Sequence, residues 1–259
     1  MVKVRFLGTC SGTEPISGMH HNSFVLEVNG VNYWFDAGEN CAHYAFTSGV
    51  NVMNTKALFI SHTHIDHTGG LANLLHGIRK LIVRENKSLI NDKLKVFIPN
   101  KQILDCAIIL VTNGKPNDFD IVEYNSVQDG VVFEDENIKV TAFHNKHLGE
   151  DGSNGWHSFS YLIEVEGKKI VFSGDVKNSL ELDQLIGNGC DLLLHETGHH
   201  KVEKVLDYVV SKKVKKLRFI HHGREVINEP LKCEELCATY GEKYGVDIKI
   251  ARDLMIEEI

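Results

Sequence analysis

The chain has 259 residues, of which 42% are hydrophobic and 24% charged, and its formal net charge is −7. This composition is ordinary for a globular protein, and a chain of this length buries enough surface to fold without disulfides. The negative charge argues against bulk electrostatic binding to long nucleic acids, and no apolar run is long enough for a transmembrane helix. The N-terminus also lacks a signal-like apolar segment. We therefore expect a cytoplasmic protein with one domain over residues 1–259 and no membrane partner.

The first part of the chain predicts three strands. Residues 2–7 alternate between apolar and polar types, and residues 23–28 and 31–35 flank Asn29-Gly30, a strong two-residue hairpin signal. The third strand runs into Asp36, which we interpret either as a turn residue or as a carboxylate that orients a metal-binding histidine from behind.

The stretch with the densest cluster of potential metal ligands follows an apolar strand predicted at residues 57–60. It holds four potential metal ligands within six residues: His62, His64, Asp66 and His67. Four such side chains are poor core residues, because packing them together would leave several polar groups unpaired. Imidazole nitrogens and carboxylate oxygens are ligands for zinc and similar divalent ions. We therefore predict a metal site here, directly before an amphipathic helix over residues 71–81.

The remainder alternates strand and helix patterns, and several strands end in further donors. Strands are predicted at residues 95–98, 119–124, 138–143, 158–164, 169–172, 191–194 and 217–220. Helices are predicted at residues 103–111, 180–186 and 202–210, and a last helix and strand lie within 231–251. The later candidate donors are His144, His147, His157, Asp175, His221 and His222.

The pattern His-x-His-x-Asp-His at residues 62–67 resembles the signature of the metallo-β-lactamase superfamily. The resemblance implies that His62 and His64 bind one metal ion, while Asp66 and His67 bind a second. It also implies the fold class, an α/β protein built as a four-layer αββα sandwich. In that fold two mixed sheets face each other under helices, and the metal ions lie at one rim.

The same resemblance implies three further ligands. One histidine between the strands at 138–143 and 158–164 should complete the first metal site; we choose His147, with His144 and His157 as alternatives. Asp175 matches the aspartate that bridges both ions, and His221 rather than His222 matches the last ligand of the second ion. The cofactors are then two divalent ions, Zn²⁺ in the first place and Mn²⁺ or Fe²⁺ as alternatives.

Short motifs in the N-terminal half are similar to those of ribonuclease Z and related phosphodiesterases: Leu7-Gly8-Thr9, Ser11-Gly12-Thr13, Asn22-Ser23 and Trp34-Phe35-Asp36-Ala37-Gly38-Glu39. The resemblance implies a hydrolase in which two metal ions lower the pKa of a bound water molecule. The resulting hydroxide then attacks phosphorus. Asp66 would orient the water or accept its proton, and a pocket histidine would protonate the leaving oxygen. No long tRNA-gripping insertion is visible, so we expect a small or single-stranded phosphodiester as substrate.

Three alternatives stay open beside this hydrolase: a ribonuclease Z-like tRNA 3′ endonuclease, a thioester or lactone hydrolase, and a metal-bound sensor without turnover. A homodimer is also open. His21 stands where the relatives have an arginine, and Trp156 suits either a pocket wall or the core. The segment beginning His195-Glu196 resembles the family's His-Glu-Ala-Thr segment, which implies a place near the pocket but no ligand role.

Overall fold

The computed structural model describes residues 1–116, 119–149 and 155–259, and the chain divides into two compact units. Unit 1 comprises Met1–Gly8, Glu14–Val127 and Asp253–Glu258. Unit 2 comprises Thr9–Thr13, Gln128–Arg252 and Ile259. Each unit therefore contains segments that are far apart in the sequence. The single-domain organisation expected from the sequence stays a prediction.

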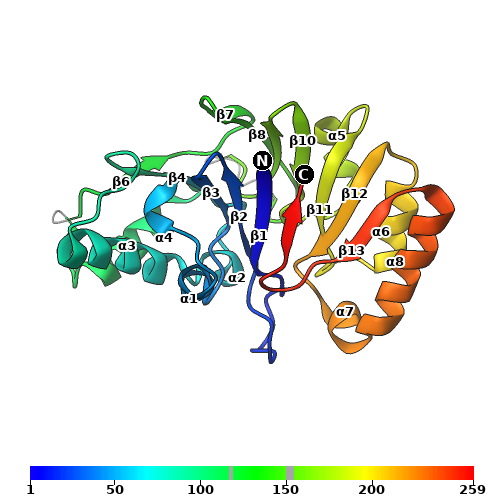
Figure 1. Cartoon of the computed structure of the whole chain (residues 1–259), viewed down its shortest axis with the longest axis horizontal. Helices are drawn as coiled ribbons and strands as arrows, with labels where there is room; N and C mark the ends of the chain where they lie inside the picture. The colour runs from blue at the N-terminus through cyan, green and yellow to red at the C-terminus, as the bar shows by residue number, and fades with distance from the viewer. Residues whose placement is uncertain (117–118, 150–154) are drawn as a thin grey trace. The chain divides into compact units, whose positions relative to one another are not determined.

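Unit 1 is built on a seven-stranded mixed sheet in the order β14-β1-β2-β3-β4-β5-β6 (Figure 1). Its strands are β1 (Val2–Gly8), β2 (Ser23–Val28), β3 (Val31–Phe35), β4 (Thr55–Phe59), β5 (Leu94–Phe97), β6 (Val122–Asn125) and β14 (Ile256–Glu258). Its helices are α1 (Cys41–Thr47), η1 (Val52–Asn54), α2 (Ile65–Thr68), α3 (Leu71–Glu85) and α4 (Lys101–Val111). Neighbouring strands are antiparallel from β14 to β3 and parallel from β3 to β6.

Both faces of this sheet are apolar. On one face, residues of successive strands such as Trp34 and Leu58 pack against α1, α3 and α4. On the other face, four phenylalanines from β2, β3, β4 and β5 stack in a row, with ring centroids 4.9, 5.0 and 4.9 Å apart. Side chains alternate between the faces of a strand, so one apolar set serves the helices and the next forms the stack. The end of β4, where the histidine-rich loop begins, lies between β3 and β5 in the interior of this sheet.

Unit 2 repeats the same succession of strand directions. Its sheet has the order β13-β12-β11-β10-β9-β8-β7, antiparallel from β7 to β10 and parallel from β10 to β13. Its strands are β7 (Gly130–Glu134), β8 (Ile138–His144), β9 (Phe159–Val165), β10 (Lys168–Phe172), β11 (Cys190–Glu196), β12 (Val214–Ile220) and β13 (Asp247–Ile250). Its helices are η3 (Ser179–Leu182), α5 (Asp183–Ile186), α6 (Val202–Val209), α7 (Arg224–Asn228) and α8 (Pro230–Tyr244).

Most predicted elements are confirmed, with a few corrections. Asn29 and Gly30 have φ angles of 53° and 80°, as a tight hairpin with two left-handed residues requires. The strand predicted at residues 119–124 begins only at Val122, and the backbone N–H of Phe119 donates instead to the carbonyl oxygen of Pro116 (3.1 Å). The helix predicted at residues 180–186 is split into η3 and α5. The sequence patterns missed the helices α1, η1, α2 and α7 and the strands β7 and β14.

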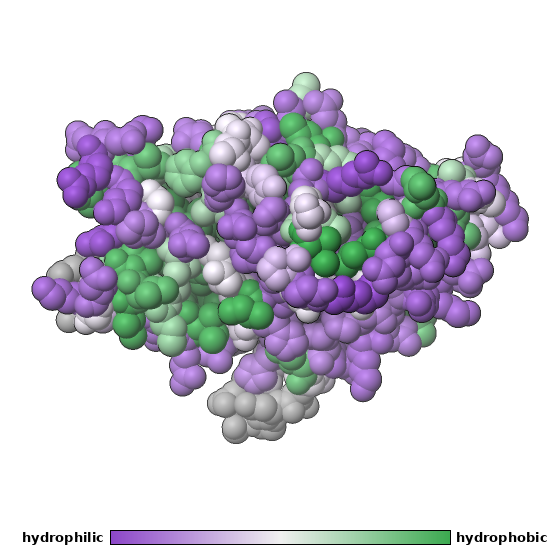
Figure 2. Space-filling view, turned by 90° about the horizontal axis from the view of Figure 1, so that it is seen from below, coloured by the Kyte–Doolittle hydropathy of each residue, from purple (hydrophilic) through white to green (hydrophobic). Residues whose placement is uncertain are grey.

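Part of the helical surface of unit 1 is apolar. Figure 2 shows hydrophobic surface gathered on its left, the side where Figure 1 draws α3 and α4. On these helices Val83, Ile109 and Leu110 are exposed.

Among the described residues, no helix is both long and apolar enough to cross a membrane. The homodimer stays a prediction.

Candidate metal centre

The loop after β4 is fixed to the rest of unit 1 by Asp36. The backbone N–H of Ser61 donates to Asp36 Oδ1 (2.7 Å), and the Ser61 hydroxyl donates to Asp36 Oδ2 (3.0 Å). Asn22 Nδ2 donates to the same Oδ2 atom (3.1 Å). Asp36 is fully buried and has a left-handed backbone with φ of 53°. Such a conformation is unusual for a residue other than glycine and occurs where surrounding contacts enforce it.

His67 is oriented by this same carboxylate. Its Nδ1 lies 2.7 Å from Asp36 Oδ2, so Nδ1–H donates there, while Nε2 lies 3.4 Å from Asp66 Oδ2. A carboxylate behind a histidine fixes the ring and its tautomer, which is the arrangement behind many metal-binding histidines. The geometry therefore favours the interpretation of Asp36 as an orienting carboxylate over that of a turn residue.

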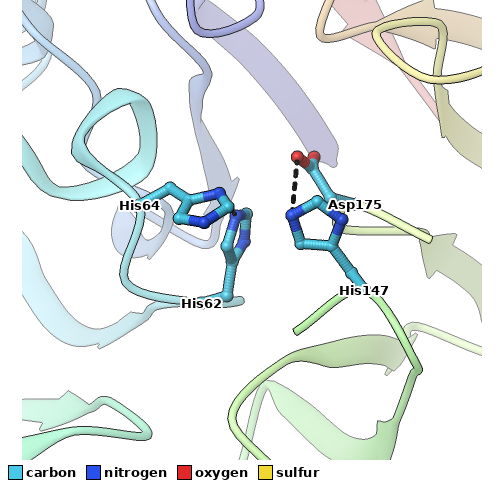
Figure 3. A group of neighbouring side chains, drawn as sticks. All are labelled: His62, His64, His147 and Asp175. Carbon is cyan, nitrogen blue, oxygen red and sulfur yellow. Dashed lines mark hydrogen bonds and ion pairs between the residues drawn. The ribbon is translucent and has the colours of Figure 1, made fainter. Parts of the chain in front are cut away.

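His62 and His64 form a second pair on this loop (Figure 3). His62 is fully buried, and its Nε2 lies 3.1 Å from His64 Nδ1. Two nitrogens bound to one tetrahedral zinc ion at ~2.05 Å would be about 3.3 Å apart. The pair therefore fits two ligands of one ion. The structure thus brings the four predicted donors of unit 1 together as two pairs.

Two glycines allow the close packing that holds this loop. A Cβ atom on Gly70 would lie 2.1 Å from the carbonyl oxygen of Gly38, and one on Gly38 would lie 2.6 Å from that of Asp66. Neither position has room for a side chain. The backbone of the loop after β3 can therefore approach α2, which carries Asp66 and His67.

In unit 2, Asp175 lies between two imidazoles. It follows β10 and is 2% exposed. Its Oδ2 lies 3.7 Å from His147 Nε2, the ion pair drawn in Figure 3, and its Oδ1 lies 3.4 Å from His221 Nδ1. Each oxygen of Asp175 therefore faces a different predicted ligand.

His222, the alternative to His221, has a structural environment. The backbone N–H of His222 donates to the carbonyl oxygen of Thr9 (2.7 Å). The ring Nε2 of His222 donates to the carbonyl oxygen of Ala251 (2.7 Å). Burial lowers the pKa of His222 to about 4, so this ring stays neutral. His221 occupies space that Gly198 leaves open, since a Cβ on Gly198 would lie 2.5 Å from His221 Nδ1. The geometry favours His221 over His222.

The alternatives to His147 lie elsewhere. His144 Nδ1 lies 2.6 Å from Asp129 Oδ2, and the His144 ring stacks on Trp156 with centroids 4.1 Å apart. His157 stands just before β9. Within the part of the chain that the structure describes, the groups of potential ligands around Asp175 include His147 but neither of these two.

Glu196 and His199 form a pair in unit 2 that the sequence analysis did not predict. The N–H of His199 donates to Glu196 Oε2 (2.8 Å), and His199 Nδ1 lies 3.1 Å from Glu196 Oε1. The hydrogen bond with Glu196 raises the pKa of His199. Burial opposes ionisation of Glu196, but hydrogen bonds with His199 and His221 keep its pKa below the usual value. The His-His doublet after the His195-Glu196 segment is the sequence signal that could have indicated this pair.

His199 is also placed to act on a ligand near Asp175. Its side chain is 45% exposed, its Nδ1 lies 3.8 Å from Asp175 Oδ2, and its ring centroid is 4.8 Å from that of His147. Because Nδ1 is held by Glu196, Nε2 is the nitrogen that can present a proton. His195 is different, because burial lowers its pKa to about 4 and its Nε2 bonds the hydroxyl of buried Ser179 (3.0 Å).

Replacing His147 by alanine should lower both the metal content and the turnover of the protein, because the change removes the imidazole that faces Asp175 Oδ2. His144→Ala and His157→Ala should keep their metal. Metal analysis of the three purified variants by mass spectrometry tests this. Loss of metal from either control, with retention in His147→Ala, would assign the ligand to the control position.

The comparisons with known proteins show which family the chain belongs to. The family described as Anti-Pycsar protein Apyc1 matches residues 2–223. The chain belongs to this family. A ribonuclease Z of Picrophilus torridus is 25% identical, with 93% of this chain and 92% of the relative covered. A ribonuclease Z of Bacillus mycoides is 30% identical over 71% of this chain, which spans about half (53%) of that relative.

The fold is shown by solved structures as well. The metallo-β-lactamase fold protein YhfI from Bacillus subtilis superimposes with a TM-score of 0.76 over 100% of both chains, at 14% identity. The predicted α/β sandwich and the relationship to ribonuclease Z are therefore confirmed. This Apyc1-family chain is a metal-dependent hydrolase of the metallo-β-lactamase superfamily, and its clusters of histidine and aspartate indicate binding of divalent metal ions.

Proposed function

We propose that the protein hydrolyses a phosphodiester in a small or single-stranded substrate, with two divalent ions. The observation that carries the proposal is Asp175 with one imidazole at each of its oxygens. One ion would be held by His62, His64 and His147, and the other by Asp66, His67 and His221. Asp175 would bridge them.

The donor chemistry of each unit supports this assignment. Unit 1 offers two imidazoles in one pair and an imidazole with a carboxylate in the other, which is too few ligands for either ion. Unit 2 adds one imidazole for each ion and a carboxylate that both can share. The mixture of nitrogen and oxygen ligands suits Zn²⁺, with Mn²⁺ and Fe²⁺ as alternatives.

The protein's own side chains would supply the remaining chemistry. Bound ions lower the pKa of water and offset charge on the phosphate oxygens. Asp66, which is 6% exposed beside His67, would orient the attacking water or take up its proton. His199 would donate a proton from Nε2 to the leaving oxygen, while Glu196 holds Nδ1 and stabilises the charged imidazole.

The relatives and the charge of the chain support the choice of substrate. The two named relatives are ribonucleases, which cleave phosphodiesters. The net charge of −7 does not suit a protein that tracks a long phosphate backbone. We therefore propose a small or single-stranded substrate rather than folded tRNA, and the cytoplasm as its place of action.

Removal and return of metal tests the function. Turnover of bis(p-nitrophenyl) phosphate should disappear after treatment with a chelator and return when Zn²⁺, Mn²⁺ or Fe²⁺ is added singly. Cyclic nucleotides, short RNA, precursor tRNA, a thioester and a lactone are compared under the best metal. Faster turnover of the thioester or lactone would contradict the proposal, and metal binding without turnover of any substrate would indicate a sensor.

A salt series separates the proposal from the tRNA endonuclease. Each phosphate contact on a single strand lowers log K by about 0.7 per tenfold rise in salt, and each on a duplex by about 0.9. A small substrate should therefore show a shallow dependence. Efficient cleavage at the 3′ side of precursor tRNA with a steep salt dependence would support the endonuclease instead.

A further inference from the structure

His221 has a backbone conformation that its surroundings must enforce. Its φ angle is 48°, in the left-handed region that residues other than glycine rarely adopt. With this backbone the side chain faces the carboxylates of unit 2, and Nδ1 of His221 lies 3.4 Å from Asp175 Oδ1 and 3.9 Å from Glu196 Oε2. Such a conformation persists only where neighbouring contacts hold it. The position of the His221 ring therefore depends on the groups that fix the backbone around it.

The backbone of the next residue, His222, is held by the segment Thr9–Ser11 of the same unit. The N–H of His222 donates to the carbonyl oxygen of Thr9 (2.7 Å). The carbonyl oxygen of His222 accepts both the N–H (3.2 Å) and the hydroxyl (2.8 Å) of Ser11. Between these bonds, Cys10 and His222 form a parallel β-bridge. The peptide groups on both sides of His222 therefore cannot rotate without breaking these bonds.

The ring of His222, which is 1% exposed, is tied to two further segments. Its Nε2–H donates to the carbonyl oxygen of Ala251 (2.7 Å), and in this tautomer Nδ1 accepts the hydroxyl of Thr197 (3.3 Å). The backbone N–H of Thr197 in turn donates to the carbonyl oxygens of Ile220 (3.0 Å) and His221 (3.3 Å). The peptide groups before and after His221 are therefore both held by contacts that meet at His222.

Two glycines show how closely these segments pack. A Cβ atom on Gly223 would lie 2.7 Å from the carbonyl oxygen of Thr197, and one on Gly198 would lie 3.2 Å from Cβ of Ser11. Neighbouring backbone thus leaves little room for the chain after β12 to relax into another conformation.

We propose that His222 is a positioning residue for the metal centre. It holds His221 in the left-handed conformation in which the His221 ring faces Asp175, and the hydroxyl of Ser11 acts through it. Both side chains therefore determine the affinity for the ion that His221 would bind, although neither contacts that ion. This inference rests on the proposed function, in which His221 is a metal ligand.

Zinc affinity measures this role without turnover. Zn²⁺ bound per chain is followed against buffered free Zn²⁺, which gives a separate Kd for each ion. His222→Ala should raise the Kd of one ion by about 10–100-fold, the usual effect of removing a group that orients a ligand, and leave the Kd of the other unchanged. Ser11→Ala should raise the same Kd by about three- to tenfold, as expected for one lost hydrogen bond.

Two further variants make the result specific. His222→Gln carries an amide N–H that can replace the bond of Nε2 to Ala251, so it should recover most of the affinity. Thr112→Val removes a buried hydroxyl that donates to the carbonyl oxygen of Ile108 in unit 1 (2.7 Å), and it should bind both ions as the wild type does. An equal loss of affinity for both ions in Ser11→Ala and His222→Ala would contradict a positioning role.

A double-mutant cycle separates positioning from general support of the fold. Once His221→Ala has removed the ring, adding His222→Ala should weaken Zn²⁺ binding no further. The same loss in both backgrounds would overturn the inference. If His221→Ala itself binds both ions with wild-type affinity, His221 is not a ligand and the proposed function fails. If His221→Ala loses one ion while Ser11→Ala and His222→Ala bind both normally, only the positioning role is refuted.

Discussion

Replacement of Asp175 by asparagine should lower turnover of bis(p-nitrophenyl) phosphate by about a thousandfold or more and deplete both metal ions. The physical reason is that Asp175 faces His147 with one oxygen and His221 with the other, so one substitution disturbs both proposed sites. An amide of the same size has only one acceptor oxygen and no charge to offset the ions. The number of metal ions per chain is measured by mass spectrometry, and kcat is measured on the same samples.

Two further variants make this result specific. His62→Ala should empty mainly the first site, so its metal content should fall to about half that of the wild type. Asp207→Asn removes an exposed carboxylate of α6 that accepts a bond from Tyr240, and it should keep both ions. Full occupancy in Asp175→Asn, equal to that of the Asp207 variant, would show that Asp175 is an ordinary turn residue.

Replacement of His199 by alanine should lower kcat by about 10²–10⁴-fold on substrates with a poor leaving group, the usual contribution of a general acid. When a dinucleotide is cleaved, one half leaves through its sugar oxygen as an alkoxide, which needs the proton that His199 Nε2 would give. The p-nitrophenolate anion leaves without one, so bis(p-nitrophenyl) phosphate should be affected far less. The measurement is the kcat of wild type and of His199→Ala on each of the two substrates.

The metal content decides between two roles for His199. Possible ligand atoms of Glu196, His199 and His221 lie within 4.8 Å of one another, so His199 also belongs to a group that could hold an ion. A proton donor can be removed without loss of metal, whereas a ligand cannot. His76→Ala, on the exposed side of α3, serves as the control. Metal loss in His199→Ala, with equal effects on both substrates, would contradict the role of general acid.

The sequence analysis predicted those features that depend on a few residues adjacent in the sequence. Asn29-Gly30 specifies its own turn, and the clustering of donors in residues 62–67 has no explanation in packing. Asp36 was recognised as a candidate because it ends a buried strand. β14 could not be predicted in this way, since it has three residues and exists through pairing with β1 across most of the sequence. Such long-range pairing leaves no periodic signal in so short a segment.

The parts of the site that were missed depend on contacts rather than on residue type. Both His199 and the neighbouring His200 lie near Glu196, but His199 Nδ1 also lies 3.8 Å from Asp175 Oδ2, whereas His200 Nε2 donates to the carbonyl oxygen of Val176 (2.8 Å). A linear pattern cannot express this difference between two neighbouring histidines.

The exchange of short segments between the two units limits how this protein can be rearranged in evolution or in the laboratory. Unit 1 takes its edge strand β14 from the C-terminus, and unit 2 takes Thr9–Thr13 from near the N-terminus, where the N–H of Ser11 donates to the carbonyl oxygen of His222 (3.2 Å). A gene divided after residue 127 would leave one half without its edge strand and the other without this support beside His221. The halves therefore cannot be shuffled between homologues as independent modules, even though each has its own sheet.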